Sequence, residues 1–224
     1  MYKMKHLAIV LISFLISSCE KEICYFAGPY VFVFPISLTP NRDTFSIGDT
    51  ISIFSSFNDD VYERKTNHKY KLVDWKFDVS MIMREISGLK TNEGAFSNFT
   101  IVMDSLSSNF TTIQYNDGLI EYTGDYTYLN NNYSFNYKII PNKPGIYFMS
   151  HSTNLIFSSY EQDFEGICSS KKGYFDSDFK MNDGNENNIH MLSSSPIEHF
   201  KTWMLNSPDD RFHRFGGYCF YVKE

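Results

Sequence analysis

Trp75-Lys76-Phe77-Asp78-Val79-Ser80-Met81 carries the clearest β-strand signal in the chain. Its apolar and polar side chains alternate strictly, which is the period of a strand with one face buried and the other in water. Shorter runs of the same kind, separated by turn residues, recur on both sides of it. This spacing of short alternating runs predicts a mainly β protein built from antiparallel strands.

Two β-hairpins are predicted after this strand. One joins residues 113–115 to 119–122 across Asn116-Asp117-Gly118, and the other joins 126–128 to 133–139 across Asn130-Asn131-Asn132. Asn, Asp and Gly tolerate the positive φ angles of tight hairpin turns. Before the strand, the continuous apolar run at residues 30–34 predicts a further, fully buried strand.

Short motifs resemble those of immunoglobulin-like domains. Gly145-Ile146-Tyr147 resembles the Gly-x-Tyr of their tyrosine corner, and Gly48-Asp49-Thr50-Ile51 resembles a stretch common in these sandwiches. The chain departs from antibody-type domains at Met149, where those domains carry a core cysteine. The resemblance implies an antiparallel immunoglobulin-like β-sandwich and leaves the strand order open.

The composition changes after about residue 157. A segment rich in Ser, Asp, Asn, Lys and Gly runs from 158 to 188, and Ser195-Pro196-Ile197-Glu198 then forms a capping box with proline at the first helical position. Apolar residues at 197, 200, 203 and 204 share one face of the predicted helix, at about 196–206. We therefore expect a single sandwich domain over 30–224, with a polar insertion and a capping helix at about 158–210.

The first residues have the pattern of a signal peptide. Lys3 and Lys5 form a small basic region, and Leu7 to Ile16 is an apolar run. A helix needs about 20 apolar residues to span a membrane, so this run is too short. Ile16-Ser17-Ser18-Cys19 follows and resembles the lipobox of bacterial lipoproteins.

The lipobox resemblance implies a signal peptide at 1–18, cleavage before Cys19, and lipid attached to the Cys19 sulfur. Residues 19–29 would then be a lipidated tether, and the chain a lipoprotein of the outer membrane. Glu20-Lys21-Glu22 resembles the export signals of some surface-displayed lipoproteins, although a solvated tether explains it equally well. The periplasmic and cell-surface faces both stay open.

Charge and length exclude some partners. Removing the first 18 of 224 residues leaves 206, enough for one sizeable core. The net charge is −6, and loss of the two signal lysines makes it −8. An acidic chain without a basic stripe argues against binding to nucleic acid or electrostatic docking on anionic lipid.

Three cysteines remain after lipidation: Cys24, Cys168 and Cys219. An exported location permits disulfides. We favour Cys168 with Cys219, which would close a loop of about 50 residues and stabilise the fold by about 3–4 kcal/mol in the chain-entropy model. Cys24 is either free or replaces one of these partners. No Cys-x-x-Cys spacing supports zinc binding or redox chemistry.

No metal or cofactor is predicted. Asp176, Asp178 and residues 182–186 are rich in oxygen ligands, but Lys180 falls where a calcium loop needs an oxygen, so we expect a solvated loop. The histidines lack metal-ligand spacing, and we expect them to be partly exposed surface residues: His68, His151, His190, His199 and His213.

No catalytic residue is assigned from the sequence. There is no Gly-x-Ser-x-Gly motif, and the acids considered for glycoside hydrolysis offer no preferred pair: Asp74, Asp78, Glu85 and Asp104. Trp75 and Trp203 would suit a sugar platform, although their positions favour the core. We expect a non-enzymatic binding or structural lipoprotein with a glycan or protein partner. The alternative is a secreted hydrolase that acts on glycan or peptide through Asp, Glu and His residues.

Overall fold

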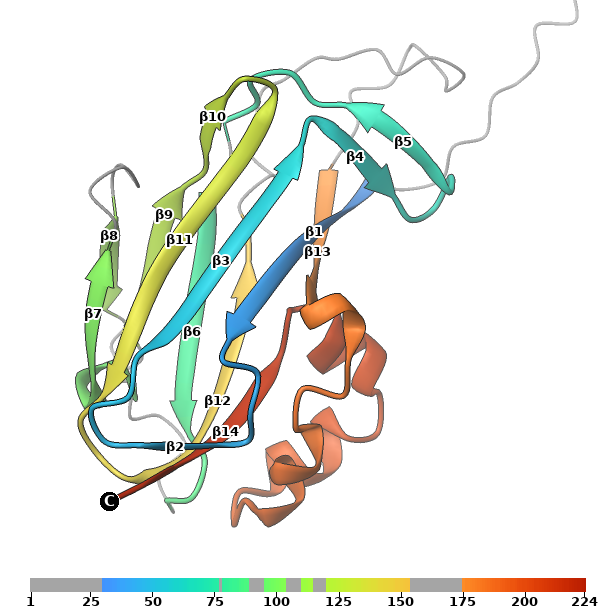
Figure 1. The fold of residues 1–224 in the computed structure, drawn as a ribbon. Helices are drawn as coiled ribbons and strands as arrows, with labels where there is room; N and C mark the ends of the chain where they lie inside the picture. The colour runs from blue at the N-terminus through green and yellow to red at the C-terminus, as the bar shows by residue number, and fades with distance from the viewer. Residues whose placement is uncertain (1–29, 77, 89–94, 104–109, 115–119, 154–174) are drawn as a thin grey trace, which may run out of the picture. The chain divides into compact units, whose positions relative to one another are not determined.

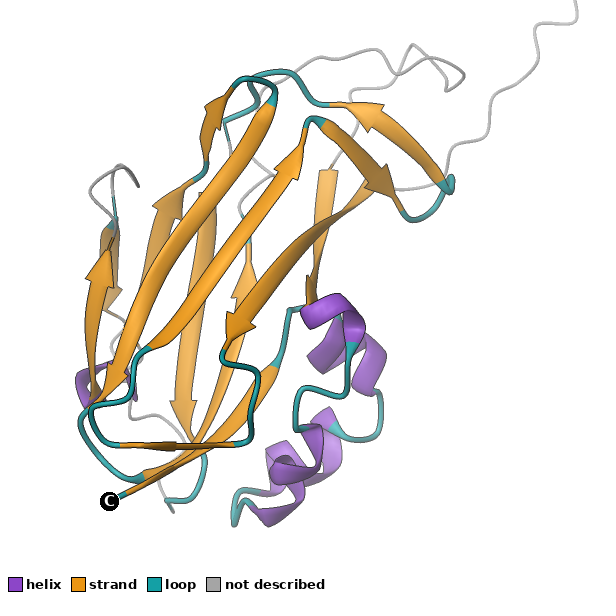
Figure 2. Ribbon diagram, viewed as in Figure 1, coloured by secondary structure: helices purple, strands orange, loops and turns teal. Residues whose placement is uncertain are grey.

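The structure, a computed structural model, describes residues 30–76, 78–88, 95–103, 110–114, 120–153 and 175–224. These residues form a two-sheet β-sandwich with mostly antiparallel strands and a few short helices (Figures 1 and 2). The mainly β fold class is therefore confirmed. The predicted signal peptide (1–18), tether (19–29) and most of the polar insertion lie outside the described residues.

The first sheet is built around the long strand β1. Its order is β10 (Thr127–Leu129), β11 (Asn132–Pro141), β3 (Ile51–Asn58), β1 (Tyr30–Thr39), β4 (Asp60–Glu63) and β5 (His68–Lys71). Two further strands join it, since β7 (Phe99–Met103) pairs with β11, and β13 (Phe175–Met181) runs parallel to β1.

The second sheet contains six strands. Its order is β2 (Thr44–Ser46), β14 (Tyr218–Lys223), β12 (Gly145–Ser152), β6 (Asp78–Glu85), β9 (Ile120–Asp125) and β8 (Thr111–Gln114). The β14–β2 pair is parallel. The short helices are η1 (Ala95–Asn98), η3 (Asn182–Gly184), η4 (Ile189–Ser194), η5 (His199–Met204) and η6 (Asp209–His213).

The core is rich in aromatic side chains, and β11 shows how alternating residues of one strand contribute to it. Its alternate residues Tyr133, Phe135, Tyr137 and Ile139 are buried, while the residues between them are mostly exposed. The Tyr133 hydroxyl donates to the Leu72 carbonyl at 2.7 Å and accepts from the Trp75 amide at 2.7 Å. Each large buried side chain contributes about 1.5–3 kcal/mol, and the Tyr133 and Tyr137 hydroxyls have hydrogen-bond partners inside the core.

The strand predicted at 75–81 begins later in the structure, and its polar face is less exposed to solvent than expected. β6 starts at Asp78, and Trp75 is buried just before it. Ser80 was expected on a water-exposed face, but it is 1% exposed, and its hydroxyl lies 3.0 Å from that of Thr123. β6 is a central strand between β12 and β9, so the Ser80 side chain is flanked on the same face by Ser152 of β12 and Thr123 of β9.

Both predicted hairpins pair as expected. β10 and β11 are antiparallel neighbours, and Asn130 and Asn131 have positive φ angles of 52° and 61°. Two successive positive φ angles are the geometry of a type I′ turn, which matches the right-handed twist of the strands. β8 pairs with β9, and the turn predicted between them lies outside the described residues.

The C-terminal region departs from prediction at two places. Residues 175–181, expected to belong to a solvated loop, form β13, and Asp178 is 5% exposed between Arg64 at 3.1 Å and Arg214 at 2.8 Å. These arginines are distant in sequence, so no local pattern reveals the pairing. The predicted helix is present as the shorter η5, and the Ser195 hydroxyl accepts the Ile197 amide at 3.1 Å just before it.

The tyrosine-corner motif has the expected hydrogen bond. The Tyr147 hydroxyl donates to the Lys143 carbonyl four residues earlier at 3.1 Å. It accepts from the side-chain amide of Asn98 at 3.3 Å. We expect Tyr147→Phe to lower the free energy of unfolding by about 1 kcal/mol, because the two part-buried hydrogen bonds of this buried tyrosine are lost. Urea unfolding measures this loss. Tyr221→Phe, at an exposed position of β14, is the control, and an equal effect of both changes would contradict the role of the corner.

Candidate functional site

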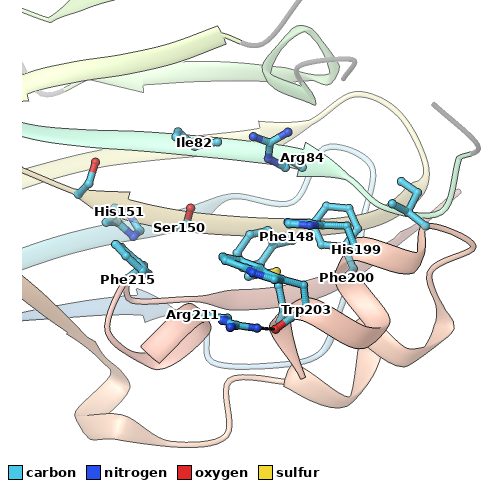
Figure 3. Close-up of a pocket in the computed structure, with 13 residues that line it drawn as sticks. Ile82, Arg84, Phe148, Ser150, His151, His199, Phe200, Trp203, Arg211 and Phe215 are labelled. Carbon is cyan, nitrogen blue, oxygen red and sulfur yellow. Dashed lines mark hydrogen bonds between the residues drawn. The ribbon is translucent and has the colours of Figure 1, made fainter. Parts of the chain in front are cut away.

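The described residues contain a cavity of about 540 Å³ on the outer side of the second sheet (Figure 3). Its floor is formed by β6 and β12, and its walls by η5, η6 and Phe215. Most of the lining side chains are aromatic or aliphatic, with a few polar groups among them. Cavities of this size and lining are typical of small-molecule sites.

The alternation of side chains along β6 and β12 determines which residues form the floor of the cavity. Phe148 of β12 is paired with Arg84 of β6, and Ser150 with Ile82. Side chains two residues apart on a strand share a face, so all four project from the outer face of the sheet. This places an arginine among apolar side chains and small hydroxyls, the combination that lines this part of the cavity.

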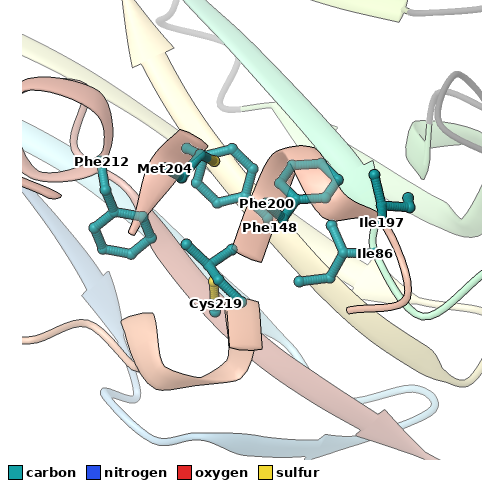
Figure 4. Close-up of a cluster of buried hydrophobic side chains, with 8 residues drawn as sticks. Ile86, Phe148, Ile197, Phe200, Met204, Phe212 and Cys219 are labelled. Carbon is teal, nitrogen blue, oxygen red and sulfur yellow. The ribbon is translucent and has the colours of Figure 1, made fainter. Parts of the chain in front are cut away.

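A hydrophobic cluster fixes the helical wall to the floor (Figure 4). Phe148 contacts Phe200 of η5 and Phe212 of η6, with ring centroids 6.0 and 5.7 Å apart. Ile197 and Met204 are also buried in this cluster, as the helical spacing predicted. The wall is therefore anchored by core packing and not only by loops.

Trp203 lies at the cavity and not in the core. It was expected on the buried helix face but is 45% exposed. The His199 ring stacks on the indole at 4.7 Å, and the Arg211 guanidinium lies 4.4 Å from its centroid, on the opposite side in Figure 3. Sugars stack on open ring faces. Since both faces of Trp203 are covered and Trp75 is buried, these residues form no sugar platform.

His151 corrects the expectation that the histidines are exposed. It is 1% exposed, and its Nε2 lies 3.2 Å from the Tyr137 hydroxyl. Burial lowers the pKa of His151 to about 4, and proximity to the Gly216 backbone offsets this only in part. Its Nδ1 has no partner with hydrogen-bond geometry among the described residues. The ring is therefore neutral near pH 7.

The cavity does not assemble a recognisable catalytic set. Among its described lining residues, no hydrogen bond joins Ser150 or Ser152 to His151 or His199, so no nucleophile is paired with a base. No cluster of three or more His, Cys, Asp or Glu residues suited to a metal occurs in the described part of the chain.

Two of the acids considered for hydrolysis, Asp78 and Glu85, are not brought together. Asp78 and Glu85 lie at opposite ends of β6, about 23 Å apart at the usual strand rise. Glu85 accepts the Ser87 amide, and Asp74 is paired with Lys76. Asp104 lies outside the described residues. A retaining or inverting carboxylate pair needs a far shorter separation.

The predicted modification sites are only partly described. Cys219, the cysteine that the described residues contain, is fully buried in β14, and burial raises the pKa of its thiol. Its predicted partner Cys168 lies outside the described residues, as do Cys19 and Cys24. The disulfide between Cys168 and Cys219 therefore stays a prediction. No helix among the described residues combines the length and apolar character needed to cross a membrane.

Comparisons with known proteins find only distant structural similarity. No protein-family model matches the sequence, and no curated protein matches it. The human F-spondin reeler domain is similar with a TM-score of 0.30 and 12% identity, over 65% of this chain and 94% of that one. A type II cohesin domain of Acetivibrio cellulolyticus has a TM-score of 0.28 and 9% identity, over 64% and 81%. These likenesses concern the β-sandwich alone.

Sequence reasoning missed most of the cavity. Ile82 and Arg84 lie beyond the strand predicted at 75–81, in the part of β6 that continues to Glu85, and strand alternation does not tell which face a helix will cover. Arg211 and Phe215 follow Pro208, where the predicted helix was expected to have ended, and the structure begins a second helix there. Proline at the start of a helix was the available signal.

Proposed function

We propose that this chain is a lipid-anchored protein of the outer membrane that binds a small ligand non-covalently in the cavity between β6, β12, η5 and η6. The cavity is the observation that carries the proposal, because its volume of about 540 Å³ and its aromatic and aliphatic lining suit a drug-sized molecule. The lack of a paired nucleophile and base among the lining residues favours binding over catalysis.

A neutral aromatic dye tests the binding role. N-phenyl-1-naphthylamine carries no charge and becomes fluorescent in apolar sites, so we expect saturable binding to the wild-type protein. Ser150→Phe fills the cavity from its floor and is expected to abolish that binding. Ser134→Phe places the same ring at an exposed position of β11 and is the control. Equal binding by wild type and Ser150→Phe would refute the site.

The anchor rests on Ile16-Ser17-Ser18-Cys19 and the signal-like run before it. One acyl chain anchors a protein only marginally, whereas several anchor it stably. We expect a palmitate analogue fed to cells to label the wild-type protein and the Cys24→Ala variant. The Cys19→Ala variant should stay unlabelled and should be lost from the membrane fraction. Cys24 is the matched control because it lies five residues further on. Labelling of Cys19→Ala at the wild-type level would refute lipidation.

The orientation follows from a protease experiment on intact cells. Degradation without lysis places the domain on the cell surface, to which Glu20-Lys21-Glu22 would direct it. Protection until the outer membrane is permeabilised places it on the periplasmic face. Either result is compatible with an outer-membrane anchor.

A further inference from the structure

Contacts with Trp203 orient the Arg211 side chain beside the cavity but do not neutralise its positive charge. Its guanidinium stacks 4.4 Å from the Trp203 ring centroid, and Nη1 donates to the Trp203 carbonyl. An arginine has five N–H donors in a rigid planar fork, so several remain after this single bond. The side chain is thus oriented, yet still able to bind an acceptor.

Arg214, in the same segment, is by contrast paired with carboxylates. It donates to Asp178 at 2.8 Å and to Asp176 at 3.3 Å, and Asp210 lies 3.8 Å from it. Arg211 forms no ion pair with a carboxylate anywhere in the described part of the chain. A positioned cation that lines a cavity without a counter-ion is suited to an anionic ligand.

The charge of the lining agrees with this. Arg84, which has an interaction of its own within the protein, also lines the cavity, on the strand floor across from Arg211 in Figure 3. None of the described residues that line the cavity is acidic. The lining therefore adds no negative charge that would repel an anion at Arg211, although the chain as a whole has a net charge of −6. A low-dielectric, partly enclosed site strengthens such an attraction relative to open water.

The rest of the lining specifies the body of the ligand. Ile82, Phe148, Phe200 and Phe215 present apolar surface next to the two arginines. A bare inorganic anion would leave this surface wet, whereas an apolar or aromatic body would bury it. The lining therefore favours a molecule with both parts.

We infer that the cavity binds organic anions, that is, an apolar or aromatic body carrying one carboxylate- or sulfonate-like group, with the anionic group at Arg211. This rests on the proposed binding function and adds the chemical class of the ligand. Arg211 would donate its N–H groups to the anionic group, while the apolar body lies over the strand floor.

Two dyes that differ in one group test this inference. 1-Anilinonaphthalene-8-sulfonate has the same aromatic body as N-phenyl-1-naphthylamine plus a sulfonate. We expect the sulfonate dye to bind the full-length protein about tenfold more tightly than the neutral dye, the gain typical of a charge-assisted hydrogen bond. Arg211→Gln should weaken binding of the sulfonate dye more than binding of the neutral dye and so remove this advantage, and Arg211→Lys should retain part of it.

Lys201→Gln is the matched control, because it removes one exposed positive charge from η5 without lining the cavity. It should keep the wild-type preference. Equal affinity for both dyes would overturn the anion inference while the binding function stands. A loss of both dyes in Arg211→Gln, with an unchanged melting temperature, would assign Arg211 to cavity shape and also overturn it. Failure of both dyes with wild type would reject the proposed function itself.

Discussion

Replacing Glu63 with alanine is expected to lower the free energy of unfolding by about 3–5 kcal/mol. The carboxylate is buried and accepts four hydrogen bonds, from the Val31 amide at 2.7 Å, the Lys65 amide at 3.0 Å, and the amide and hydroxyl of Thr66 at 2.7 and 2.6 Å. It thereby ties the β4–β5 connection to the start of β1. Alanine would leave the buried Val31 amide and the part-buried donors of Lys65 and Thr66 without this acceptor.

Chemical unfolding measures this effect, and Asp60→Asn is the matched control on the same strand. Asp60 is exposed, so its change should stay within about 0.5 kcal/mol. Burial raises the pKa of Glu63, but the hydrogen bonds from Thr66, Val31 and Lys65 outweigh burial and hold it below its usual value. The contribution of Glu63 is therefore complete above about pH 4.5 and is lost below it as pH falls through the folded-state pKa. A Glu63→Ala protein as stable as Asp60→Asn would contradict this role.

The second large effect is a loss of stability in mild acid that depends on His151. Its pKa is about 4 in the folded protein, lowered from 6.5 by burial. Below pH 6.5 the unfolded chain takes up a proton that the folded chain does not bind until about pH 4. The free energy of unfolding should therefore fall by up to about 3 kcal/mol between these values, at about 1.4 kcal/mol per unit of pKa difference.

His151→Gln isolates this contribution. The variant lacks a titrating ring, so its stability should fall by about 2–3 kcal/mol less than that of the wild type between pH 7 and pH 4.5. Comparing each protein with itself at two pH values separates this from any general loss caused by the substitution. His190→Gln removes an exposed histidine and should keep the wild-type pH dependence. If His151→Gln keeps it too, the buried ring is not the cause.

Local patterns predicted the β fold well because strands, turns and corners depend on neighbouring residues. The β10–β11 hairpin follows from Asn130 and Asn131, which accept positive φ angles, and the corner follows from a glycine two residues before Tyr147. Period-two burial in β11 is visible in the sequence because its inward residues are all large and apolar. Each of these features is decided within about ten residues.

Polar residues were harder to place. Asp178 and His151 look like surface residues in the sequence, and both are buried. Asp178 is buried because Arg64 and Arg214 reach it from distant segments, and His151 because its ring packs against Tyr137 and Phe179 of the first sheet. The burial of a polar group depends on partners that are remote in sequence, which local periodicity does not record.

The sequence by itself therefore determined the fold class, the hairpins and the apolar face of η5, all of which depend on short-range periodicity and turn chemistry. It is also the source of the predicted lipid anchor at Cys19. Only the tertiary structure decided which polar groups are buried and that Arg84, Trp203 and Arg211 meet at one cavity. These three residues come from a strand and two helices, more than 100 residues apart at the extremes. Their meeting depends on how η5 and η6 pack on the second sheet.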